Sequence, residues 1–138
     1  METTSVAAHL RVVLARTARR LRQQAGTDLS PSQTATLATI ERRGPLTPSE
    51  VATCERIQRP TATRVIARLE EAGLIDRAAD PTDGRSSLLT ITAEGRALLE
   101  QGRTRKDLFL ARRLETLEPD EVATLERAAE ILERVLDQ

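Results

Sequence analysis

Two closely similar tetrapeptides mark helix starts and constrain the fold more than any other feature of the chain. In SPSQ, residues 30–33, a serine suited to be an N-cap precedes a proline at the first helical position, and a glutamine follows three residues after the cap. TPSE, residues 47–50, repeats the pattern. Because Gly44-Pro45 ends the first of these segments, the sequence predicts two consecutive helices with a tight break between them.

A longer helix and a hairpin are expected next. After a break at residues 55–58, a fourth helix is predicted from Arg59 to Ala72, with Pro60 in its first turn and Gly73 just beyond its end. Residues 74–78 and 86–91 have the composition of short strands and flank a turn-rich segment.

Long helices are predicted at both ends of the chain. A first helix should end near Gly26, Thr92 should cap a fifth helix from Ala93 to about Leu114, and Pro119 should start a sixth. The sixth helix carries apolar residues spaced 3, 4, 3, 4, namely Val122, Leu125, Ala129, Leu132 and Leu136. Spacing alone leaves two alternatives open: this stripe packs on the chain's own core, or it packs on a second copy.

Composition limits the class of protein. Aromatic residues make up 1% of the 138 residues, so the core must be aliphatic, which favours packed helices. No apolar run reaches the roughly 18–20 residues of a membrane span. The single cysteine, Cys54, excludes a disulfide framework. We therefore expect a cytoplasmic protein with no membrane partner.

Charge is distributed unevenly although the formal net charge is zero. Residues 56–68 contain four arginines and no acid, whereas residues 114–138 contain two arginines and eight acids. A basic middle segment is the electrostatic signature of a nucleic-acid partner.

The order of these elements predicts a winged helix-turn-helix, mainly α with a small β-hairpin wing. In such a module the second helix of the pair enters the DNA major groove with its N-terminal residues. The alternative is that these arginines form the solvent-exposed face of a surface helix and bind no ligand. The candidate DNA-binding residues of this segment are Arg56, Gln58, Arg59, Thr61, Thr63, Arg64 and Arg68.

The hairpin turn, DPTDGR at residues 80–85, places an arginine beside two acids. Arg85 is expected to enter the minor groove, where the negative potential is enhanced. Asp83, together with Asp80, is expected to accept hydrogen bonds from the turn backbone or from a nearby arginine, and so to fix the shape of the wing. An ordinary polar turn without a ligand is the alternative.

Two segments, RPTATRVIARLEEAGLIDR (residues 59–77) and DPTDGRSSLLTITAEG (residues 80–95), resemble the MarR-type (multiple antibiotic resistance regulator) transcription factors. The resemblance covers about 40 residues directly. Arg64 matches the family's recognition-helix arginine, and Asp83 and Arg85 match its wing pair.

This resemblance implies a homodimer that binds a palindromic site in double-stranded DNA, most often as a repressor. Residues 1–28 and 93–138 would form the dimerisation region, and residues 29–92 the DNA-binding lobe of a single interleaved domain. The family often binds a small anionic or phenolic effector, for which no residues are assigned. The expected dimerisation residues are Leu10, Val13, Leu14, Val122, Leu125, Leu132 and Leu136.

Other functions have weaker sequence support. The chain lacks tyrosine, so Cys54 is interpreted as a small helix residue rather than a redox sensor, and the lone His9 does not provide a metal site. No nucleophile–base pair or phosphate-binding loop is visible, so neither an enzyme nor a cofactor is expected. A winged-helix adaptor for protein–protein interaction is the remaining alternative, against which the basic segment argues.

Overall fold

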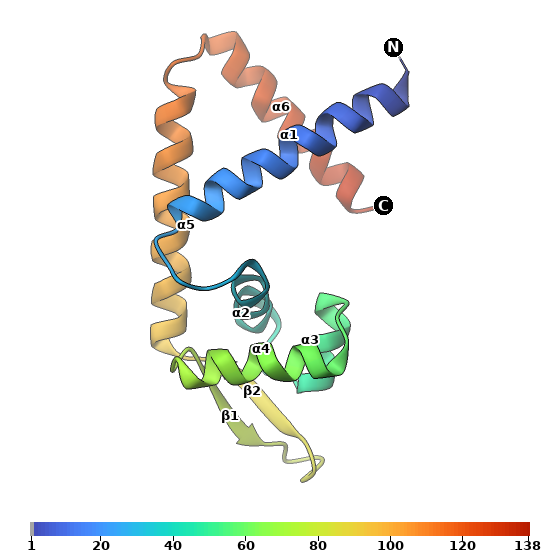
Figure 1. Cartoon of the computed structure of the whole chain (residues 1–138), viewed down its shortest axis with the longest axis vertical. Coiled ribbons are helices and arrows are strands. Elements are labelled where there is room, and N and C mark those ends of the chain that lie inside the picture. The colour runs from blue at the N-terminus through green and yellow to red at the C-terminus, as the bar shows by residue number, and fades with distance from the viewer. Residues whose placement is uncertain (1) are drawn as a thin grey trace. The chain divides into compact units, whose positions relative to one another are not determined.

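The structure, a computed structural model that describes residues 2–138, contains six helices and one two-stranded antiparallel sheet in those residues. Figure 1 shows them in chain order. The elements are α1 (Thr3–Gln24), α2 (Pro31–Arg43), α3 (Pro48–Glu55), α4 (Arg59–Glu71), β1 (Ile75–Ala79), β2 (Ser87–Ile91), α5 (Ala93–Leu114) and α6 (Pro119–Leu136). The predicted fold, mainly helical with a hairpin wing, is confirmed.

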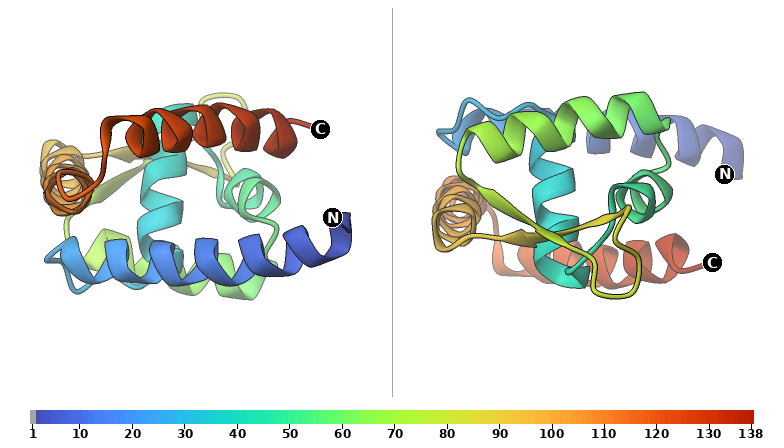
Figure 2. Two further views of the ribbon diagram at one scale, coloured as in Figure 1. Left: turned by 90° about the horizontal axis from the view of Figure 1, so that it is seen from above. Right: turned by 90° about the horizontal axis from the view of Figure 1, so that it is seen from below.

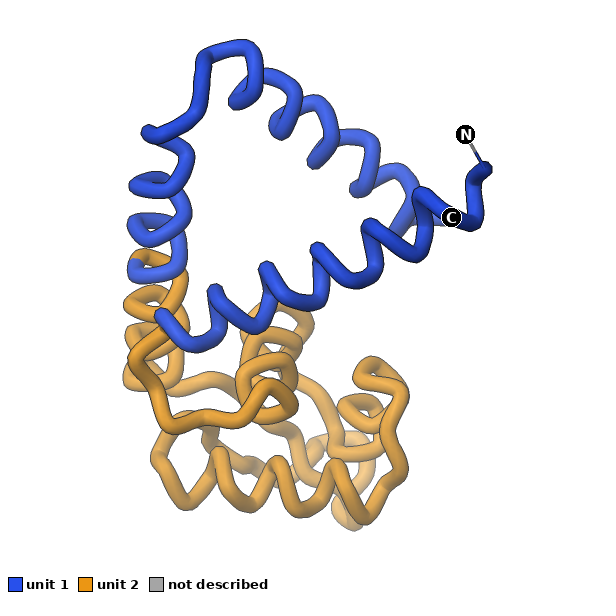
Figure 3. Tube along the Cα trace, turned by 45° about the horizontal axis from the view of Figure 1, so that its top comes forward, with its two compact units in different colours: residues 1–24, 105–138 blue, residues 25–104 orange. Residues whose placement is uncertain are grey.

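The chain forms two compact units, which Figure 3 distinguishes by colour. The first, here called the terminal unit, comprises residues 1–24 and 105–138. The second, here called the central unit, comprises residues 25–104. The chain passes from the central unit to the terminal unit within α5, since that helix spans residues 93–114.

Both predicted capping boxes are present. The Ser30 hydroxyl accepts a hydrogen bond from the Gln33 backbone N–H at 3.1 Å, and the Gln33 side chain accepts from the Ser30 N–H at 3.0 Å. Thr47 and Glu50 make the same two bonds at the start of α3, at 3.1 and 3.0 Å. Each box satisfies two backbone N–H groups that the first turn of a helix leaves without partners.

The core lies in the central unit and is aliphatic, as the composition predicts. Its fully buried side chains come from α2, α3, α4 and both strands, and together they form one hydrophobic cluster. The largest of them are Leu37, Ile40, Val51, Ile66, Leu69, Ile75 and Leu89. On α4 the buried residues recur every three or four positions, so one face of this helix is buried and the other is left exposed.

The two strands of the hairpin lie within one residue of their predicted bounds: β1 was expected at residues 74–78 and β2 at residues 86–91. β1 pairs with β2 in the register Ile75 to Ile91 and Ala79 to Ser87. A further contact was not predicted: Leu46, just before α3, forms an antiparallel bridge with Leu89, with N–H···O distances of 3.1 and 2.7 Å. The bridge attaches the base of the wing to the segment between α2 and α3.

The start of α5 is packed closely against the turn after α4. Thr92 caps this helix, since its hydroxyl accepts from the Gly95 N–H at 3.0 Å and donates to the Gly73 carbonyl at 2.8 Å. Gly73 has a φ of +74°, the left-handed conformation expected of a glycine just after a helix. A Cβ at Gly95 would overlap the carbonyl oxygen of Leu74, so this position requires glycine.

The terminal unit has no comparable core. No residue of α1 or α6 is buried, and the buried residues of α5 all lie before residue 105. Every large hydrophobic residue that is exposed in residues 2–138 belongs to this unit. These residues are Val6, Leu10, Val12, Val13, Leu14, Leu108, Leu110, Leu125, Ile131, Val135 and Leu136.

Two glycines of α5 should respond in opposite ways to alanine. Gly95→Ala should destabilise the protein by about 1–3 kcal/mol, because the added methyl group has no space beside Leu74. Gly102→Ala should stabilise it by about 0.5–1 kcal/mol, since a Cβ there would lie 3.6 Å from the Ala25 Cβ and alanine favours helix. Urea unfolding at one fixed protein concentration measures both; equal effects of the two substitutions would contradict this packing.

Candidate nucleic-acid interface

The turn between α3 and α4 sets the direction of the second helix. Arg56 adopts the left-handed conformation, with φ 54° and ψ 44°, and ends α3. The following Ile57 N–H donates to the Ala52 carbonyl at 3.0 Å, which closes the end of the helix. Gln58 then returns to extended backbone and becomes the N-cap residue of α4.

The N-terminus of α4 differs from those of α2 and α3. Gln58 makes no side-chain capping hydrogen bond to this helix, whereas α2 and α3 are both closed by capping boxes. Backbone N–H groups of the first turn therefore have no side-chain cap, and they lie at the positive end of the helix dipole. A helix end of this kind suits contact with phosphate.

The exposed face of α4 carries the predicted residues. Val65, Ile66 and Leu69 face the core, whereas Arg59, Thr63, Arg64 and Arg68 are exposed and Thr61 is half-buried. No carboxylate in residues 2–138 forms an ion pair with any of these three arginines or with Arg56. The surface is therefore cationic and unneutralised.

Two of the arginines are held by neighbouring hydroxyl groups. Arg59 Nη1 donates to Ser49 Oγ on α3, and Arg64 Nη2 donates to Thr61 Oγ1 at 3.4 Å. The Thr63 hydroxyl donates to the Arg59 carbonyl at 3.0 Å, which leaves its oxygen as an acceptor, and Thr63 as a whole is exposed. Sequence reasoning did not identify Ser49, because no local pattern signals a contact across ten residues.

The wing lies on the same side of the central unit as α4, which Figure 2 shows in its right-hand view. Its turn is ordered by the two acids, as predicted from the turn chemistry. Asp83 Oδ1 accepts from the Arg85 backbone N–H at 3.0 Å, and Asp80 Oδ1 accepts from the Thr82 N–H and hydroxyl at 2.9 and 2.8 Å. The backbone hydrogen bond from Thr82 lowers the pKa of Asp80, because it stabilises the ionised form of the carboxylate.

The Arg85 side chain is exposed at the tip of the wing and forms no ion pair within residues 2–138.

The wing is joined to α4 by a second contact that the sequence did not indicate. Arg77 of β1 donates through Nε and Nη2 to the two carboxylate oxygens of Glu70, at 3.3 and 3.4 Å. This two-point contact joins the strand to α4 at the protein surface.

Neither residue considered for other chemistry is part of this surface. Cys54 is half-buried on α3 with Arg43 Nη1 at 3.6 Å from its sulfur, and His9 is exposed on α1. No group of three or more potential metal ligands occurs within residues 2–138. None of the helices described has the length and hydrophobicity needed to cross a bilayer.

These features define a winged helix-turn-helix protein with a cationic, solvent-facing recognition helix. A family model described as "MarR family" matches residues 29–87. An uncharacterized HTH-type transcriptional regulator of Mycobacterium bovis is 35% identical over 134 residues, which cover 96% of this chain and 94% of that protein. The multiple antibiotic resistance protein MarR of Salmonella typhimurium is 35% identical over 100 residues, which cover 72% of this chain and 69% of that protein. The chain therefore belongs to the MarR family, and the resemblance seen in the sequence is confirmed.

Solved structures agree with this assignment. A crystal structure described as a transcriptional regulator of Pseudomonas aeruginosa superposes with a TM-score of 0.89 at 34% identity, covering 98% of this chain and 96% of that one. Streptococcus pneumoniae FabT in complex with DNA shares the fold, with a TM-score of 0.72 at 19% identity over 99% and 98% of the two chains. The protein is a DNA-binding transcriptional regulator rather than a winged-helix adaptor.

Removing the Asp83 carboxylate should affect DNA binding in two opposite ways, one through its charge and one through the shape of the wing. Asp83→Ala removes a negative charge, which by electrostatics alone would tighten DNA binding; it also removes the bond to the Arg85 N–H. We expect geometry to dominate and binding to weaken by about 0.5–1 kcal/mol. Fluorescence anisotropy with one labelled duplex measures the effect. Asp76→Ala, which removes an acid from the base of the same hairpin, is the control, and tighter binding by Asp83→Ala would refute wing ordering.

Proposed function

We propose that the protein is a dimeric repressor that binds a palindromic operator in double-stranded DNA. The observation that carries this proposal is the exposed face of α4, where arginines without acidic partners surround a helix N-terminus that has no side-chain cap. A dimer would present two such helices, and each would enter the major groove of one half-site. Binding over a promoter would then block transcription. The protein would act in the cytoplasm, where the DNA of a bacterial cell lies.

The residues have distinct proposed roles. The N-terminal part of α4 would read base edges through Gln58, Arg59, Thr61, Thr63 and Arg64, because arginine can pair with guanine and the threonine methyl can contact thymine. Arg56 and Arg68 would contact phosphate, and the charges of Arg59, Arg64 and Arg85 would also neutralise phosphates close to the base edges and grooves that they reach. Arg85 would enter the minor groove, and Asp83 would hold the wing in the shape that places Arg85 there.

Dimerisation is proposed through residues 1–28 and 93–138, with residues 29–92 as the DNA-binding lobe. The exposed apolar residues of the terminal unit support this proposal, since they include Leu10, Val13, Leu14, Leu125 and Leu136. The other two predicted dimerisation residues, Val122 and Leu132, are half-buried on α6. An exposed apolar surface of this extent is typical of a protein–protein interface.

We propose that a small anionic effector releases the repressor from DNA. The chain has one aromatic residue, Phe109, and the guanidinium groups of Arg20 and Arg113 lie 5.7 and 4.8 Å from its ring centre. An effector would therefore be recognised by its charge rather than by stacking on aromatic rings, which favours an anionic over a phenolic molecule. Screening small carboxylic acids for release of labelled DNA tests this proposal.

DNA affinity should fall steeply with salt. A dimer that presents Arg59, Arg64, Arg68 and Arg85 twice would neutralise roughly 6–8 phosphates, which gives a slope of about −5 to −7 in a plot of log K against log salt. Arg64→Ala should weaken binding and reduce the slope by about 2, because the dimer loses two contacts. Arg11→Ala on α1 is the control with the same charge change. A wild-type slope near zero would contradict the proposed interface.

A charge placed on the apolar face of α6 should separate the dimer without unfolding the chain. Leu125 is 48% exposed, so Leu125→Arg causes no burial of charge within one chain, but burial at an interface would cost several kcal/mol, on the order of 3–5. Sedimentation equilibrium measures the outcome. Ala123→Arg, which adds the same charge to the opposite face of α6, should leave the dimer intact. A wild-type monomer at micromolar concentration would refute the proposal.

A further inference from the structure

Ser49 has the same position in the second capping box as Ser32 has in the first, yet the two side chains differ in what they contact. Each serine follows the proline of its tetrapeptide, SPSQ or TPSE, and each is exposed. The Ser32 hydroxyl has no hydrogen-bond partner within residues 2–138, whereas Ser49 Oγ accepts from Nη1 of Arg59. Thr47 and Glu50 make the capping bonds of α3, so capping does not account for the Ser49 contact.

The bond between Ser49 and Arg59 joins two helices of the central unit at the start of the recognition helix, because Arg59 is the first residue of α4. Figure 1 shows α3 beside this end of α4. Val51 of α3 and Ala62 of α4 are buried in one hydrophobic cluster, which fixes the two backbones relative to each other. A hydrogen bond to an oxygen on α3 therefore limits the conformations that the long Arg59 side chain can adopt.

The contact leaves one edge of the Arg59 guanidinium group available. This group has five N–H donors in one plane, and Ser49 uses one of those on Nη1. Within residues 2–138, nothing else bonds to the Arg59 side chain, so Nε and Nη2 keep their N–H groups free. Arg77 uses these same two atoms to meet both carboxylate oxygens of Glu70. Guanine presents a similar pair of acceptors, O6 and N7, in the major groove.

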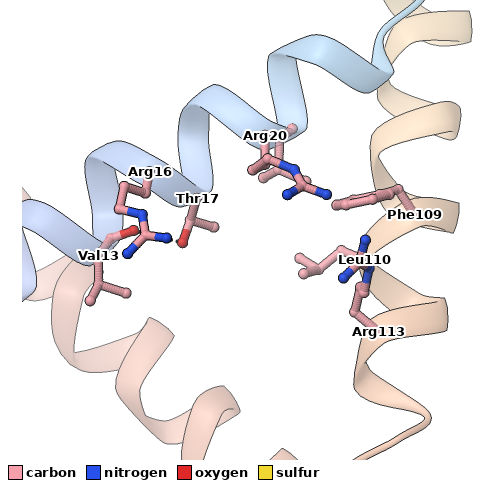
Figure 4. Close-up of a pocket in the computed structure, with 8 residues that line it drawn as sticks. Val13, Arg16, Thr17, Arg20, Phe109, Leu110 and Arg113 are labelled. Carbon is pink, nitrogen blue, oxygen red and sulfur yellow. Dashed lines mark hydrogen bonds between the residues drawn. The ribbon is translucent and has the colours of Figure 1, made fainter.

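Other arginines without an acidic partner are oriented less strictly. The bond from Arg64 to Thr61 is 3.4 Å long and lies within one helix. In the terminal unit, Arg20 and Arg113 lie over the ring of Phe109, as Figure 4 shows. The face of a ring attracts the positive charge as a whole and does not select one N–H group. Arg59 differs from these three arginines because a directional bond from a second helix sets which edge it presents.

We propose that Ser49 determines DNA specificity by positioning Arg59 to pair with guanine at one position of each half-site. The inference rests on the proposed function, in which α4 enters the major groove. Ser49 carries no charge, so it changes which base is preferred and not how many phosphates are neutralised. Without Ser49, the Arg59 side chain would also sample conformations that reach phosphate, and the base preference would weaken.

Base preference at each position of the site tests this role. The wild type and each variant are used to select bound duplexes from a pool with about 20 randomised base pairs, two helical turns, and the bound duplexes are sequenced. Ser49→Ala should reduce the preference for guanine at one symmetry-related pair of positions by about threefold to tenfold per half-site, because the cost of ordering Arg59 then falls on binding. Preferences at the other positions and the salt dependence of binding should stay as in the wild type.

Two matched variants separate the hydroxyl group from the helix. Ser32→Ala makes the same change at the same position of α2 and should keep the wild-type preferences. Ser49→Thr keeps a hydroxyl group and should retain the preference for guanine. Circular dichroism verifies that each variant is folded.

A double-mutant cycle identifies Arg59 as the residue through which Ser49 acts. Arg59→Ala should remove the preference for guanine at the same positions, and adding Ser49→Ala should cause no further loss. The proposal is overturned if Ser49→Ala matches Ser32→Ala, if it weakens binding to all sequences equally, if its effect persists without Arg59, or if the base that depends on Arg59 is not guanine. In each of those cases, selection of one palindromic site by the wild type would leave the proposed function standing. A wild type that selects no sequence would instead refute the proposed function.

Discussion

The apolar surface of α1, α6 and the second half of α5 is the feature that most constrains how this protein can exist in water. These helices bury no residue of their own, although they contain every exposed large hydrophobic residue in the part of the chain that the structure describes. Leaving such a surface in water is unfavourable by roughly 25 cal/mol per Å². The central unit has no such need, because its aliphatic core is closed around Leu37, Ile66 and Leu89. The central unit buries its apolar residues within a single chain, whereas the terminal unit can bury its apolar residues only against a partner.

This division suits the work of a MarR-family regulator. In the central unit, three features join α4 and the wing to their surroundings: the left-handed turn at Arg56, the Leu46–Leu89 bridge and the Arg77–Glu70 contact. A single recognition helix reads only a few base pairs, so two copies related by a twofold axis would extend the site into a palindrome. α5 belongs to both units and joins them covalently.

Local signals allowed much of the fold to be predicted from the sequence. The capping boxes at Ser30 and Thr47, the glycine after α4 and the cap at Thr92 involve residues within a few positions of one another, and all of them are present. The contacts that sequence reasoning missed join distant positions, such as Arg59 to Ser49 and Arg103 to Glu41, which are 10 and 62 residues apart. The hydrogen bond to Glu41 raises the pKa of Arg103, yet neither residue stands out in the sequence. Such pairs depend on how helices pack, which periodicity does not specify.

In the proposed function, two recognition helices, held by one symmetric dimer, read one DNA site. Footprinting of the protein on DNA upstream of its own gene tests this claim most directly. We expect a twofold-symmetric protected region with two major-groove segments separated by about one helical turn, roughly 10 base pairs, and minor-groove protection where the wings reach. Protection of a single, asymmetric segment, or no protection at low salt, would contradict it.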